Sequence, residues 1–152
     1  MDNEVFRKTY RSINERFCPY EKSILTNNCA CSQADRFCIA EREGVHCKSA
    51  KAQSQCLELL DILRRQSRFA LKSTDERSAL PHAKAMRVQV GGLRGLHAAL
   101  KPGQPVPPLI KDVHGVIQKA RRRFGSLEQL PFQIIIQQIA AYVGRKRFRD
   151  RH

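Results

Sequence analysis

The chain has 152 residues, of which 41% are hydrophobic and 28% are charged, and its formal net charge is +14. This composition is ordinary for a globular protein and excludes a wholly disordered chain. The most apolar stretch, residues 132–143, is too short to span a bilayer, and the first residues lack the apolar run of a secretory signal. We therefore expect a cytoplasmic protein.

Charge and cysteine divide the chain into two regions. Residues 1–76 carry 13 Lys/Arg and 11 Asp/Glu, a balance of +2, whereas residues 77–152 carry 15 and 3, a balance of +12. All six cysteines lie in the first 56 residues. We expect a cysteine-rich metal- or cluster-binding helical region over residues 1–76 and a basic helical region over residues 77–152, packed as one compact domain.

The first region is predicted to be a series of helices. Apolar residues recur at helical spacing over residues 6–17, and Pro19 ends that helix and suits the first turn of a short second one. The capping-box pattern of residues 32–35 predicts a further helix, which Gly44 ends. Ser49 then caps a helix with a clear apolar stripe.

The second region is also predicted to be helical. Residues 83–100 are apolar but contain a Gly91-Gly92 pair, so either a short strand or broken helices fit them. A proline-rich linker and two further helices complete the chain, over residues 101–108, 109–124 and 131–144. The predicted fold class is therefore all-α, a small bundle of about five or six helices.

The cysteine spacing matches neither a zinc-finger pattern nor the ferredoxin run. Its local context is more informative, because Cys18, Cys31 and Cys47 each stand just ahead of a predicted helix N-terminus. Such ends offer free N–H groups and a positive partial charge, both of which favour thiolates. Cys56 lies on the apolar stripe of its helix, where it can close a site from inside.

All-cysteine ligation with irregular spacing favours an iron–sulfur cluster, such as a 4Fe–4S cluster, over zinc. Zinc and unrelated structural thiols remain as alternatives. Cys38 falls on a predicted helical apolar face and is expected to be a core residue, while His46 is a reserve ligand. The candidate ligands are Cys18, Cys29, Cys31, Cys47 and Cys56.

The basic residues of the second region exceed what helix capping requires, so they predict an anionic partner. That partner is a nucleic acid, an acidic protein or an anionic lipid surface. Few aromatic residues accompany the charges, so sequence-specific base recognition is not predicted. The candidate contact residues are Arg121, Arg122, Arg123, Arg145, Lys146, Arg147 and Arg149.

Enzymatic motifs are absent from the sequence. It contains no P-loop, no G-x-S-x-G and no H-E-x-x-H, and the glycine-rich residues 91–95 favour a turn over a dinucleotide site. We therefore expect a non-enzymatic redox or sensing module whose iron–sulfur or other metal centre is coupled to docking on an anionic partner. The alternatives are a zinc-stabilised nucleic-acid-binding protein and an electron carrier or adaptor for an acidic protein.

Overall fold

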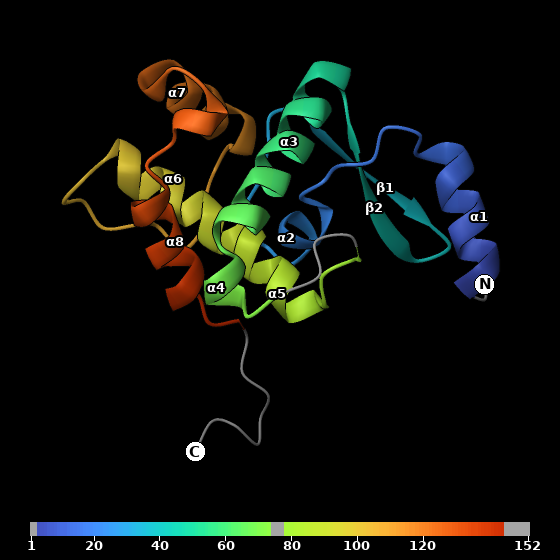
Figure 1. Cartoon of the computed structure of the whole chain (residues 1–152). Coiled ribbons are helices and arrows are strands. Elements are labelled where there is room, and N and C mark those ends of the chain that lie inside the picture. The colour runs from blue at the N-terminus through green and yellow to red at the C-terminus, as the bar shows by residue number, and fades with distance from the viewer. Residues whose placement is uncertain (1–2, 74–77, 145–152) are drawn as a thin grey trace.

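The computed structural model describes residues 3–73 and 78–144 (Figure 1). It is mostly helical, at 58%, but 11% of it forms a two-stranded antiparallel sheet. The fold is therefore mixed α/β, and the all-α prediction is wrong. No helix in the described ranges is both long enough and apolar enough to cross a membrane.

The N-terminal half places a β-hairpin between short and long helices. The predicted short helix after Pro19 is confirmed, and so is the Ser49 cap, whose Oγ accepts the Ala52 N–H at 3.1 Å. The first helix ends at residue 13, earlier than its apolar pattern suggested. The elements are α1 (Asn3–Ile13), α2 (Glu21–Leu25), β1 (Ala34–Ile39), β2 (Arg42–Cys47), α3 (Ala50–Gln66) and α4 (Arg68–Leu71).

The hairpin replaces the helix predicted from residue 32 onward. β1 and β2 pair from Ala34–Cys47 to Ile39–Arg42, and the two residues between them adopt positive φ, 47° at Ala40 and 73° at Glu41. Such a turn suits the twist of a hairpin but normally uses Asn and Gly, so the sequence did not indicate it. Gly44 is a strand residue and not a helix terminator.

All the regular elements of the described C-terminal half are helices. Residues 82–100 form one run in which a π-helical segment joins two α-helices, so neither the strand nor the turn considered for the glycines is present. A Cβ on Gly91 or Gly95 would lie 2.6 Å from the Cα of Ile139 or Ile135, so both glycines allow close helix packing. The elements are α5 (His82–Met86), η1 (Arg87–Gly91), α6 (Gly92–Leu100), α7 (Val113–Phe124), η2 (Leu127–Gln129) and α8 (Phe132–Ala141).

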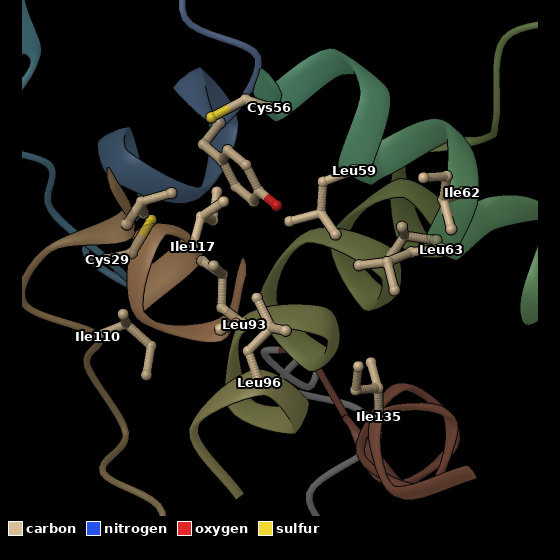
Figure 2. Close-up of a cluster of buried hydrophobic side chains, with 14 of the residues drawn as sticks. Cys29, Cys56, Leu59, Ile62, Leu63, Leu93, Leu96, Ile110, Ile117 and Ile135 are labelled. Carbon is tan, nitrogen blue, oxygen red and sulfur yellow. The ribbon is translucent and has the colours of Figure 1, made fainter. Parts of the chain in front are cut away.

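A single hydrophobic core joins the two halves. α3 lies at the centre, with the hairpin and α1 on one side and α6, α7 and α8 on the other (Figure 1). The core includes Leu59 and Leu63 from α3 and Leu93 from α6. Figure 2 shows Cys29 and Cys56 together at one end of this cluster, with side chains of α8 at the other. Cys18, Cys29 and Cys56 are themselves members of this core, and Cys31 packs against it.

Candidate cysteine centre

Four cysteines line one small cavity beside the core. Cys18 comes from the loop before α2, Cys31 from the loop before β1, Cys47 from the end of β2 and Cys56 from α3. The cavity has a volume of about 10 Å³, which is room for about one water molecule. The other residues that line it are mainly apolar. Four of the five candidate ligands thus face the same space from four separate segments.

Backbone N–H groups point at the sulfurs of this cavity. The Tyr20 N–H hydrogen-bonds Cys18, and the N–H groups of Gln33 and His114 hydrogen-bond Cys31. His114 is in the first turn of α7, so Cys31 does lie at a helix N-terminus. That helix is α7, however, and not the one predicted at residue 32. Donors in these positions stabilise a negatively charged sulfur.

The loop that carries Cys29 and Cys31 is bonded to the start of α7. The Ala30 N–H donates to the Ile110 carbonyl at 2.9 Å, and the Val113 N–H donates to the Ala30 carbonyl at 2.9 Å. The Ser32 N–H donates to Asp112 Oδ1, also at 2.9 Å. These bonds hold one wall of the cavity against a segment about 80 residues away in the chain.

Burial raises the pKa of four of the thiols in the metal-free protein. It raises the pKa of Cys18 and of Cys29 to about 12 from an ordinary value of 9.0. Burial also raises the pKa of Cys56 and of Cys31, in the latter case against the lowering effect of the hydrogen bonds from Gln33 and His114. A cation that replaced the protons would remove this penalty, because it would neutralise the thiolates.

The side chains do not stand in a ligating arrangement. Within residues 3–73 and 78–144, no three Cys, His, Asp or Glu side chains form a group placed to hold a metal ion. Cys47, for example, donates its S–H to the Ser49 carbonyl at 3.2 Å. Rotation about χ1 can redirect a cysteine sulfur without a change of the backbone.

The remaining candidates lie outside this cavity. Cys29 is buried near Cys18 and Cys31 but is not part of the cavity wall. Cys38 is exposed, so its assignment to the core is wrong, because the segment is a strand and its side chain is on the outer face. The His46 ring meets Asn14, with 3.1 Å between Nδ1 and Oδ1, and does not line the cavity.

Tyr20 is a feature of the cavity that the sequence analysis missed. It lines the cavity, is only 1% exposed, and its hydroxyl has no hydrogen-bond partner within the described ranges. A buried hydroxyl without a partner is unfavourable, by about 1–3 kcal/mol. Its position directly between the Cys18-Pro19 pair and α2 was the available indication.

Of the predicted anionic-partner residues, the structure describes Arg121, Arg122 and Arg123, and these three do not all line the same cavity. Arg122 and Arg123 line a groove of about 1050 Å³ beside the cysteine centre. Arg121 lines a different cavity, next to Glu58. Arg145, Lys146, Arg147 and Arg149 lie outside the described residues. The sequence analysis missed three lysines of the groove, which are dispersed along the chain: Lys101, Lys111 and Lys119.

The fold and these two features define a small mixed α/β protein with a buried thiol cluster next to a basic groove. No protein-family model, curated protein or solved structure matches the chain.

Proposed function

We propose that the chain is a non-enzymatic metal-binding protein in which Cys18, Cys31, Cys47 and Cys56 hold an iron–sulfur cluster that acts in redox chemistry or sensing. The observation that carries the proposal is the convergence of four thiols, from four separate segments, on one enclosed cavity. Ordinary core packing does not require four cysteines to share a single space.

The surroundings of the cavity suit a thiolate-ligated centre. Free N–H groups of Tyr20, Gln33 and His114 donate to two of the sulfurs, and such hydrogen bonds tune cluster potentials. The described structure pairs no cysteines as disulfides. Free buried thiols are typical of a reducing compartment, so the proposal places the protein in the cytoplasm.

A single tetrahedral zinc ion is the second candidate, and the size of the cavity favours it. The present space admits about one water-sized sphere, whereas an iron–sulfur cluster requires the four sulfurs to spread apart. With zinc, the metal would have a structural role only. The net positive charge of residues 77–152 supports docking on an anionic partner in either case.

The test is metal analysis of protein purified without oxygen. Iron, acid-labile sulfide and zinc are measured per chain, together with visible absorption, for the wild type and for serine variants of each cavity cysteine. Cys38→Ser is the matched control, because the Cys38 thiol is exposed and does not line the cavity. We expect each cavity variant to lose most of the bound metal and Cys38→Ser to retain it.

The outcomes separate the candidates. Iron and sulfide in the wild type, lost in the cavity variants, support the cluster. Stoichiometric zinc in a colourless protein supports the structural ion instead. A wild type that takes up neither metal, or one whose metal content falls equally in Cys38→Ser, would overturn the proposal. Cys29 does not line the cavity, so we expect Cys29→Ser to retain the metal. Retention would show that Cys29 is a neighbour of the metal site and not a ligand.

A further inference from the structure

The basic groove is a concave site lined by both charged and apolar side chains. It lies between the segment that follows α6 and the exposed side of α7. Leu100, Leu109 and Val116 contribute apolar surface. Its volume of about 1050 Å³ is just above the usual range for small-molecule sites, which is roughly 300–1000 Å³. The groove can therefore hold an organic ligand of nucleotide size.

The charge of the groove is strongly one-sided. Its cationic side chains are Lys101, Lys111, Lys119, Arg122 and Arg123. Among the described residues that line the groove, Asp112 alone is acidic. In the described part of the chain the ion pairs lie elsewhere, so no carboxylate pairs with these five cations. Mutual repulsion among them is unfavourable until an anion enters.

Helix capping explains only part of this charge. Arg122 and Arg123 are in the last turn of α7, where cations are favourable, and Arg123 also donates to the Leu100 carbonyl at 3.1 Å. Lys119 is in the middle of that helix. Lys111 stands two residues before its first turn, where the helix dipole disfavours a cation. These lysines therefore indicate a ligand.

The chemistry of the lining points to phosphate groups on a small organic molecule. Lysine and arginine are the side chains that bind phosphate most strongly, and the apolar side chains of the groove suit a carbon skeleton. Among the described residues that line the groove there is no Phe, Tyr or Trp, so they offer no platform of large aromatic rings for stacking successive bases of a single strand. A nucleotide-sized phosphorylated molecule fits the observations better than a nucleic acid.

The groove shares a wall with the cysteine centre. Ile110 and Asp112 line the groove, while Val113 lines the cysteine cavity. Residues 110–113 are hydrogen-bonded to Ala30 and Ser32 of the loop that carries Cys29 and Cys31. The His114 N–H reaches Cys31 itself. A ligand that moved this segment would displace one sulfur, and a change at the sulfurs would reshape the groove.

We infer that the basic groove binds a small molecule carrying two or more phosphate groups, and that this binding is linked to the state of the cysteine centre through residues 110–114. The binding itself is independent of the proposed function, whereas the linkage rests on it. Linkage is reciprocal, so the metal changes ligand affinity by the same factor as the ligand changes metal affinity.

Binding is tested with ADP and with inorganic pyrophosphate by titration calorimetry, on metal-stripped protein kept under reductant. The test variant is Lys119→Glu combined with Arg122→Glu. The control is Lys22→Glu combined with Lys51→Glu, which makes the same charge change at two exposed lysines that do not line the groove. We expect saturable, salt-sensitive binding that falls about tenfold or more in the test variant and less than threefold in the control.

Two results would overturn the site. One is the absence of saturable binding of either probe at low salt. The other is an equal loss in the test and control variants, which would mean a general charge effect. Tighter binding of a short oligothymidylate than of ADP, lost equally in both variants, would replace the small molecule with nucleic acid.

Linkage is tested by repeating the ADP titration on metal-loaded protein. We expect the affinity to differ by at least about fivefold between loaded and stripped protein. Equal affinities would overturn the linkage and leave the binding site standing. If the protein takes up no metal, the proposed function and the linkage fall together, and the titration of stripped protein still decides the site.

Discussion

Alkaline pH is expected to destabilise the metal-free protein, because its buried thiols keep protons that the unfolded chain releases. Burial raises the pKa of Cys18 and of Cys29 to about 12, compared with an ordinary value of 9.0. The pKa of Cys56 and of Cys31 is raised as well. Between about pH 9 and pH 12 the unfolded chain therefore binds fewer protons than the folded chain, so stability falls as pH rises.

The magnitude follows from proton linkage. One thiol that is protonated in the folded state and ionised in the unfolded state lowers the free energy of unfolding by about 1.4 kcal/mol per pH unit. Cys18 and Cys29 together contribute about 2.7 kcal/mol per unit near pH 10.5. Domains of this size have total stabilities of about 5–15 kcal/mol, so the loss is easily measured.

The assay is urea denaturation of metal-stripped, reduced protein at intervals from pH 7 to pH 10.5. Lysines and tyrosines also ionise in this range, so the informative quantity is the difference between variants. Cys18→Ala should show a slope shallower than wild type by about 1.4 kcal/mol per pH unit above pH 9. Cys38→Ala, which removes an exposed thiol, is the matched control.

Two observations would refute this reasoning. The first is a wild-type stability that stays flat from pH 8 to pH 10.5. The second is a Cys18→Ala slope equal to that of wild type. Metal-loaded protein should behave oppositely below pH 9, because its folded state holds thiolates while the unfolded chain takes up protons. Its stability should therefore rise with pH until the free thiols ionise.

Three further substitutions test the packing. Gly95→Ala should lose about 1–3 kcal/mol of stability, because the new Cβ would lie 2.6 Å from the Ile135 Cα. Gly144→Ala is its control and should change the stability little, because the nearest atom to the new Cβ would be 4.0 Å away. Tyr20→Phe should gain about 1 kcal/mol in metal-free protein, because it removes an unpartnered buried hydroxyl. Glu41→Gly should gain about 0.5 kcal/mol by relieving a positive φ of 73°. Thermal or urea denaturation measures all three, and a stabilised Gly95→Ala, a destabilised Tyr20→Phe or a destabilised Glu41→Gly would contradict the respective packing argument.

Local features of the sequence predicted several elements correctly. Ser49 and Pro19 act on the backbone within a few residues, so the starts of α3 and α2 could be foreseen. The apolar periodicity of α7 and α8 was equally informative, although both helices are shorter than expected. Capping and periodicity are short-range effects, which is why one sequence suffices to detect them.

The hairpin and the glycine-rich run could not be predicted in this way. Ala40 and Glu41 give no indication of a left-handed turn, and β1 is stabilised by its pairing with β2 and not by its own propensities. Gly91 and Gly95 resemble turn residues until the backbone of α8 packs against them. In both places a contact between distant segments decided the local structure.

The sequence by itself determined which residue types are present and in which half: six thiols before residue 57 and most of the excess positive charge after residue 76. Only the tertiary structure decided that Cys18, Cys31, Cys47 and Cys56 share a cavity while Cys38 faces outward. It also gathered three dispersed lysines into one groove and placed the start of α7 against the cysteine loop. The reason is physical: these groupings arise from hydrogen bonds and packing between segments far apart in the chain, which no local pattern encodes.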